Sequence, residues 1–190
     1  MSAAPQRLIV GISGASGTVY GIRVLETLKR LGVETHLVMS KAAEVTLAHE
    51  GGAIKVADIR ALADHWHKPE DIGAAPASGS FRTLGMIVAP CSVRSMSEIA
   101  TGVTTSLLTR AADVCLKERR RLVLMVRETP LHTGHLRSML QLSEMGAVIA
   151  PPVPAFYAKP DTLADMVEHT VGRMLDLFGL DCGTINRWGE

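Results

Sequence analysis

The sequence carries no excess charge of either sign, few aromatic residues and no apolar run long enough to cross a bilayer. Its 190 residues hold 20 Lys and Arg against 19 Asp and Glu, a net charge of +1, and 4% aromatics. A nearly neutral chain has no overall field that would attract nucleic acid or an acidic membrane surface. A transmembrane helix would need about 20 consecutive apolar residues. We therefore expect neither nucleic acid nor a membrane as a partner.

Cysteine is also scarce, and its spacing excludes two common structural devices. Cys91, Cys115 and Cys182 are three residues with no CxxC pair among them. This pattern indicates no disulfide framework and no zinc site, and it fits the reducing cytoplasm, where we expect the protein to be located. The lead residues MSAAPQR lack the apolar core of a signal peptide, so residues 1–6 are expected to be flexible.

Apolar strands alternate with helices along the chain. Strands are predicted over residues 7–12, 34–39, 86–90, 121–126 and 147–150, and helices over 18–31, 41–50, 56–65, from about 95, 105–118, 132–144 and 161–178. The strands are continuous apolar runs, which are typical of a parallel sheet buried on both faces. We predict a single three-layer α/β domain over residues 1–190, with helices on both faces of a parallel sheet.

Residues 67–81 are rich in Pro, Gly, Ala and Ser and are predicted to form a long loop, which in a small domain is usually functional or disordered. His65 and His67 flank Trp66 just before it. These two histidines offer possible metal ligands, but the pattern is more typical of a solvated helix end. No metal is expected.

The first strand runs into a loop of small residues, in the stretch RLIVGISGASGTVYG at residues 7–21. A dinucleotide fingerprint would need glycine at Ser13 and an acidic residue after the second strand, which instead ends in Met39-Ser40-Lys41. A Walker A loop would need a GK[ST] sequence, which is absent. A mononucleotide or phosphate site remains, built from backbone N–H groups, Ser16 and a helix N-terminus. The same residues also suit a tight turn without a ligand, and the loop alone does not separate the two.

Three further strand ends carry polar residues, namely Ser40-Lys41, the segment 90–95 (PCSVRS) and Arg127-Glu128. The carboxyl ends of parallel strands meet at one edge, so these residues should converge with the first loop in one crevice. Ser95 is expected to begin a helix, as a phosphate ligand or only as its cap. Cys91 has no histidine in an obvious partner role, so a buried thiol is expected rather than a nucleophile.

Basic and acidic side chains suggest the chemistry of the crevice. Arg127 suits a phosphate and Glu128 suits proton transfer, although an Arg-Glu pair is also common in structural salt bridges. Arg110 and Lys117 lie seven residues apart and so share one helix face, which solvent could equally cover. The run at residues 119–121 is expected to mark a surface helix end.

Six segments together resemble the UbiX-type flavin prenyltransferases. They are GISGASGTVYG, THLVMSKAA, ASGSF, PCSVRSMS, TRAADVCLKERRRLVLMVRETPLH and PPVPAFY, in order from about Arg7 to the C-terminal RWGE. The resemblance implies a flavodoxin-like, Rossmann-like fold in a trimer-based dodecamer with the active site at a subunit junction. It implies that dimethylallyl phosphate prenylates reduced FMN at N5 and C6 without a metal. The products would be phosphate and prenylated FMN, which would pass to a UbiD-type decarboxylase, as in ubiquinone biosynthesis.

The resemblance also implies roles for individual residues. The FMN contacts would be Ala15, Ser16, Gly17, Ser40, Ser92, Val93, Arg94, Ser95 and Arg127. The prenyl phosphate would be held by Tyr157 and Arg173 with Arg110, Lys117 and Arg127. Ser16, Lys117 and Glu128 would be catalytic, with Glu128 or the released phosphate taking the C6 proton. Cationic side chains would stabilise the leaving phosphate. Trp188 would cover a neighbouring site.

Two alternatives from other classes remain open at this point. An FMN-dependent cysteine-type decarboxylase would share the fold, but it relies on a histidine after the early helix and on a PASANT-like motif, where this chain has PCSVRSM and His49. A non-catalytic FMN carrier would need the loops at residues 14–17 and 90–92. It would not need Lys117, Glu128, Tyr157 and Arg173 together.

Overall fold

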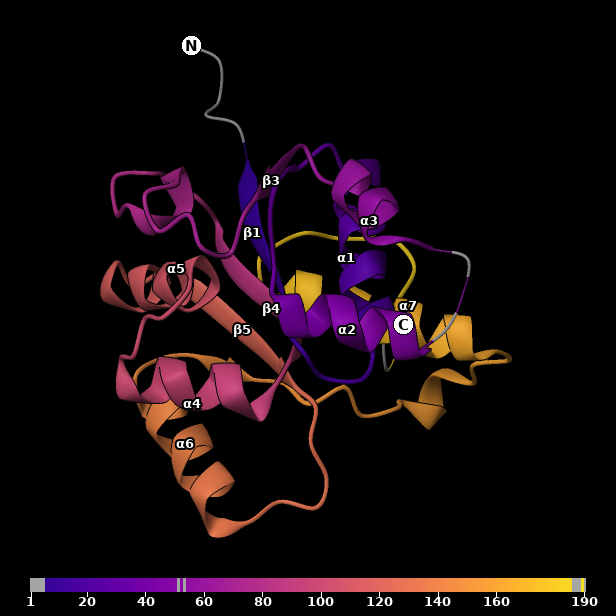
Figure 1. Ribbon diagram of the computed structural model, residues 1–190. Helices are drawn as coiled ribbons and strands as arrows, with labels where there is room; N and C mark the ends of the chain where they lie inside the picture. Colours follow the sequence, from indigo (N-terminus) through magenta and orange to yellow (C-terminus); the bar gives the residue numbers. More distant parts are fainter. Residues whose placement is uncertain (1–5, 51, 53, 186–188, 190) are drawn as a thin grey trace.

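A six-stranded parallel sheet forms the centre of the molecule in the computed structural model (Figure 1). The structure describes residues 6–50, 52, 54–185 and 189, so the lead residues 1–5 and Trp188 lie outside it. The strands are β1 (Arg7–Ile12), β2 (Glu34–Met39), β3 (His65–His67), β4 (Gly85–Cys91), β5 (Arg121–Val126) and β6 (Val148–Ile149). They lie in the order β3-β2-β1-β4-β5-β6, and every pairing is parallel. The predicted flavodoxin-like α/β fold is confirmed.

Helices cover both faces of the sheet. They are α1 (Thr18–Arg30), α2 (Lys41–Glu50), α3 (Val56–Leu62), α4 (Val93–Thr101), α5 (Leu107–Lys117), α6 (Thr133–Glu144) and α7 (Leu163–Asp176), with 3-10 turns at Ala75–Ala77 and Phe156–Ala158. One core cluster joins the sheet to α1, α2, α3 and α7, and the other joins it to α4, α5 and α6. Strands β1, β2, β4 and β5 are almost wholly buried because both faces are covered. None of the described helices is long and apolar enough to cross a membrane.

The structure differs from prediction around His65 and His67. Helix α3 ends at Leu62, and residues 65–67 form β3, the short strand at the edge of the sheet, rather than a solvated helix end. A three-residue polar strand has no apolar run to reveal it, and its pairing with β2 is a tertiary contact. Arg121 begins β5, as the predicted strand over residues 121–126 has it, so the basic run at residues 119–121 extends from the end of α5 into the strand.

A close approach of α1 to β4 brings two of the predicted loops together. A Cβ added to Gly21 would lie 2.3 Å from the carbonyl oxygen of Ala89, which real structures do not allow. Glycine here therefore lets the first turn of α1 sit against the end of β4. The loop before α1 and the loop after β4 become neighbours for this reason.

Candidate functional site

Ser13 joins the ends of β1 and β4. Its buried hydroxyl donates to the carbonyl oxygen of Pro90 at 2.9 Å and accepts the backbone N–H of Ser92 at 2.7 Å. The N–H of Ser13 donates to the same Pro90 carbonyl at 3.1 Å. The serine that breaks the dinucleotide glycine pattern therefore fixes the two loops to one another.

The start of α4 presents backbone N–H groups at this edge. The N-cap is Ser92, whose hydroxyl accepts the N–H of Ser95 at 3.2 Å, so Ser95 lies inside the first turn instead of capping it. The hydroxyls of Ser92 and Ser95 are 3.2 Å apart. Arg94 is exposed and pairs with Glu98 at 3.0 Å. The partial positive charge of a helix start and two adjacent hydroxyls form a suitable site for an anion.

The start of α1 already binds a carboxylate. Gly17, the N-cap of α1, has a left-handed backbone conformation and no side chain to cap the helix. The N–H groups of Gly17 and Thr18 instead donate to the carboxylate of Glu50. Burial acts to raise the pKa of Glu50, but hydrogen bonds from Thr18, Gly17 and Ser16 outweigh it and hold the pKa below its usual value. No local pattern in the sequence points to Glu50, which lies 33 residues from Gly17 at the end of α2. Its position shows that this loop accepts an anion.

One cleft of about 320 Å³ lies between these elements. Its lining includes three of the four predicted strand ends, through Gly14 after β1, Ser40 and Lys41 after β2, and Ser92, Arg94 and Ser95 after β4. Ser16 and Gly17 line an adjoining hollow of about 430 Å³ with Glu50. The cleft lies at the carboxyl edge of a parallel sheet, where ligands bind in this kind of fold. The predicted convergence is therefore observed for these three ends.

Gly14 sets the shape of the first loop. A Cβ at Gly14 would lie 2.4 Å from the Cβ of Ala42 on α2, so a side chain would push the loop away from that helix. Ala15 continues the turn, with its N–H donating to the carbonyl oxygen of Ser13 at 2.9 Å. The small residues therefore allow close packing, and they leave Ser16 exposed on the loop.

The fourth strand end lies beside the cleft. The N–H of Arg127 donates to the carbonyl oxygen of Cys91 at 3.0 Å, which places Arg127 next to Ser92. The half-buried carboxylate of Glu128 accepts the N–H of Thr129 at 3.0 Å. Neither residue is among those that line the cleft in the described part of one chain.

The other predicted phosphate ligands lie elsewhere on the chain, and three of them pair with nearby carboxylates. Arg110 and Arg173 contact Asp113 and Asp176 at 2.6 Å, and Lys117 contacts Glu118. Lys117 ends α5, just before β5 begins, so it lies toward the amino edge of the sheet. Tyr157 packs edge-on against His169 of α7, with ring centroids 5.7 Å apart. In the described part of one chain, none of these four residues is among those that line the cleft.

Burial excludes the buried cysteines as nucleophiles. It raises the pKa of the Cys91 thiol to about 12, although the next residue, Ser92, lines the cleft. It also raises the pKa of Cys115 to about 12, only partly opposed by Arg120. A thiol with so high a pKa is protonated at neutral pH and unreactive. The prediction of a buried, inert Cys91 is confirmed.

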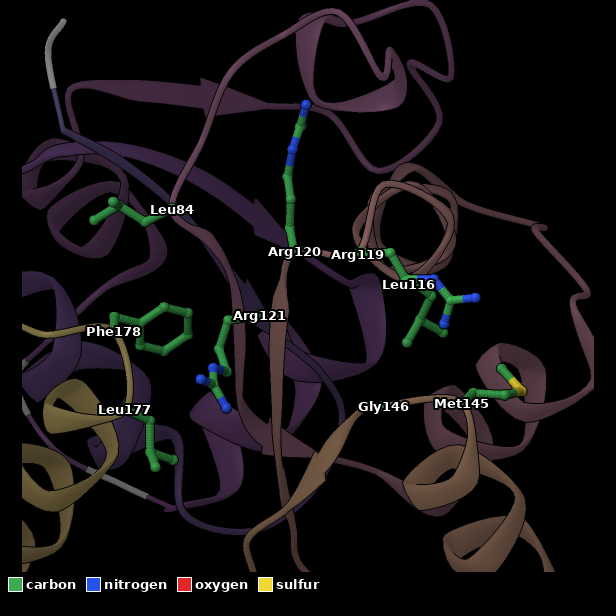
Figure 2. A pocket seen from close by; sticks show the side chains of 9 residues that line it. All are labelled: Leu84, Leu116, Arg119, Arg120, Arg121, Met145, Gly146, Leu177 and Phe178. Carbon is green, nitrogen blue, oxygen red and sulfur yellow. The ribbon is translucent and has the colours of Figure 1, made fainter.

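A larger cavity, of about 490 Å³, lies at the opposite edge of the sheet beside Arg119, Arg120 and Arg121 (Figure 2). Figure 2 shows Arg120 extending away from Leu177 and Phe178. Its guanidinium donates to the carbonyl oxygens of Phe81 and Gly79 at 2.6 and 2.5 Å. Arg120 thus anchors the long loop. We assign the functional site to the smaller cleft, because a helix start and hydroxyl groups line it, whereas neither is among the residues that line the larger cavity.

Known proteins resemble the chain over nearly its whole length. The family model described as Flavoprotein matches residues 2–175. The flavin prenyltransferase UbiX of Thauera aromatica is 56% identical over 182 residues, covering 96% of this chain and 93% of that protein.

Two solved structures have the same fold at high identity. AnUbiX (PadA1) in complex with FMN and dimethylallyl pyrophosphate has a TM-score of 0.96 at 52% identity, covering 98% of this chain and 99% of that one. The dodecameric FMN-dependent UbiX-like decarboxylase of Escherichia coli O157:H7 has a TM-score of 0.94 at 49% identity, covering 97% of this chain and 100% of that one.

Proposed function

The chain belongs to the Flavoprotein family and, within it, to the UbiX flavin prenyltransferases. From this premise we propose how it acts. It is an enzyme that prenylates FMN. The donor is a dimethylallyl phosphate, and the new bonds form at N5 and C6 of the reduced flavin. The cysteine-decarboxylase and carrier alternatives are not favoured, because relatives at this identity are prenyltransferases. The whole chain acts as a single flavoprotein domain.

The single observation that carries the proposal is the pair of helix starts held together by Ser13 at the carboxyl edge of the sheet. The donor set there suits FMN, since the N–H groups and hydroxyls of residues 92–95 suit a phosphate and the α1 loop already holds the anionic Glu50. Ala15, Ser16, Gly17, Ser40, Ser92, Val93, Arg94, Ser95 and Arg127 would hold the flavin nucleotide. FMN supplies the electron-rich ring that attacks the prenyl carbon.

The protein residues would control charge and protons around that reaction. Loss of the allylic phosphate leaves negative charge on the departing group, which Arg110, Lys117, Tyr157 and Arg173 would stabilise. Formation of the second bond, at C6 of the flavin, releases the proton from C6. Glu128, which follows Arg127, would accept this proton. One oxygen of the Glu128 carboxylate accepts the N–H of Thr129 at 3.0 Å, and its second oxygen would take this role.

The protein acts as a homo-oligomer, and we propose a trimer-based dodecamer with the active site at a subunit junction. The separation of Lys117, Tyr157 and Arg173 from the cleft within one chain supports this arrangement. Large apolar side chains also remain exposed on the arm before α7 and at its start, with Phe156 at 72% and Leu163 at 80%. Apolar groups exposed to this extent indicate contact surfaces. The prenylated FMN would pass to a UbiD-type decarboxylase, as in ubiquinone biosynthesis, and the location would be the cytoplasm.

The test is the mass of the flavin after an anaerobic reaction. The oligomeric protein is mixed with reduced FMN and dimethylallyl phosphate, or the diphosphate, then denatured, and the released flavin is weighed. We expect a gain of one five-carbon unit, lost in Glu128→Gln but kept in the control Glu144→Gln at the exposed end of α6. Unmodified FMN with both donors would overturn the proposal.

A further inference from the structure

Three polar side chains meet where β2 lies against β3, away from the cleft. Glu34 and His36 are two residues apart on β2 and so point to the same face. His65 is directly opposite His36 in the register of the two strands. One ligand atom from each of Glu34, His36 and His65 lies within 4.8 Å of the others. His36 is 4% exposed, so the cluster extends inward from the sheet edge.

The two distances from Glu34 to the histidines fit the coordination shell of a small metal ion. Glu34 Oε1 lies 3.1 Å from His36 Nε2 and 3.5 Å from His65 Nε2. Zinc binds imidazole nitrogen and carboxylate oxygen at about 2.0–2.2 Å in a tetrahedron, which puts neighbouring ligand atoms roughly 3.4 Å apart. The two distances from Glu34 Oε1, 3.1 and 3.5 Å, lie on either side of that value.

Surrounding groups hold the ligand atoms in orientation. Arg7 Nε contacts the other carboxylate oxygen, Glu34 Oε2, at 2.8 Å, which leaves Oε1 facing the imidazoles. His36 Nδ1 lies 2.9 Å from His67 Nε2, so the ring nitrogen of His36 that does not face Glu34 is fixed. Such outer contacts orient the ligands in metal sites.

An aromatic ring covers part of the cluster. The edge of Phe81 packs on the His36 ring, with centroids 4.8 Å apart, and shields it from water.

We propose that Glu34, His36 and His65 bind a divalent transition-metal ion with the preferences of zinc, which ties β3 to β2. Glu34 begins β2, whereas the cleft lies beyond its other end, so the ion takes no part in the flavin reaction. Its function would be structural, because the ion would add a link between side chains to the backbone pairing of β3 with β2. Without a metal, His67 Nε2–H would donate to His36 Nδ1 and His36 Nε2–H to Glu34, and the cluster would be only a hydrogen-bonded network.

Equilibrium dialysis against Zn²⁺, followed by elemental analysis, tests the proposal on the untagged, FMN-loaded oligomer. We expect stoichiometric zinc in the parent protein. His65→Ala should weaken binding more than tenfold, and His67→Ala should weaken it roughly 10- to 100-fold through lost orientation. The matched control is His132→Ala. It disrupts the stacked pair of His132 and His135, whose ring centroids lie 3.6 Å apart, and it should bind zinc like the parent.

Two further measurements distinguish a metal site from a network. Co²⁺ bound at the site should give intense tetrahedral visible bands that are absent in His65→Ala, and Zn²⁺ should raise the Tm of the parent but not of this variant. The His65 side chain is half exposed, so the variant should fold and retain FMN, which its flavin spectrum reports. No stoichiometric zinc in the parent, or equal zinc in parent and His65→Ala, would overturn the proposal.

Discussion

The backbone N–H of Ser92 donates to the hydroxyl of Ser13 across 79 residues of sequence, at 2.7 Å. This hydrogen bond is buried, and it connects the loop after β1 with the start of α4. The relative position of the two anion-binding loops therefore depends in part on this hydroxyl group.

Replacement of Ser13 by alanine should both destabilise the protein and weaken FMN binding. The buried N–H of Ser92 would lose its acceptor, which costs about 1–3 kcal/mol in free energy of unfolding. Urea unfolding and FMN titration measure the two effects. The control Ser143→Ala, at the exposed end of α6, should change neither. Parent-like FMN affinity in Ser13→Ala would show that the bond does not position the site.

Replacement of Gly14 by alanine should displace the first loop. The new Cβ would approach the Cβ of Ala42 to 2.4 Å, and overpacking of this kind costs roughly 1–3 kcal/mol. FMN titration and thermal unfolding should both report the loss. The control is Gly73→Ala, where the nearest atom to the new Cβ lies at an ordinary 3.6 Å. Equal behaviour of the two variants would contradict the close packing of the loop on α2.

Replacement of Glu50 by glutamine should lower stability at neutral pH but not in acid. The pKa of Glu50 is depressed in the folded protein, so its contribution is present above the unfolded pKa, about 4.3, and is lost as pH falls through the folded value. We expect a loss at pH 7 of about 0.5–2 kcal/mol, the usual size for a helix cap. Urea unfolding from pH 7 downward should show the difference from the parent shrinking below about pH 4. A difference that grows in acid would contradict this assignment.

Mixed oligomers should test whether one active site takes residues from two chains. Ser16→Ala and Lys117→Ala chains are each expected to be inactive alone. In a random mixture at equal amounts, about a quarter of junctions would combine an intact Ser16 with an intact Lys117 from a different chain. The flavin-mass assay on co-refolded chains should therefore recover roughly that fraction of activity. A mixture of Lys117→Ala with Lys117→Met is the control and should recover none, and equal failure of both mixtures would place Ser16 and Lys117 of each site in one chain.

Much of the fold follows from the sequence because its signals are local. The buried runs of β1, β2 and β5, the helices between them and the small residues before α1 are all visible as patterns of neighbouring residues. The positions of strand ends then follow from the parallel sheet, which predicted the cleft at residues 14, 40 and 92–95. The match of motif and spacing also identified the family.

Only the tertiary structure revealed contacts between distant segments. Strand β3 exists because residues 65–67 pair with β2, and Glu50 reaches the α1 loop because α2 folds back on it. That Arg110, Lys117, Tyr157 and Arg173 are not among the residues lining the cleft likewise depends on where their elements pack. The sequence by itself determined the elements and their chemistry, since helix and strand periods are local. Which side chains meet was decided only by packing, because contacts between elements join residues that no local pattern connects.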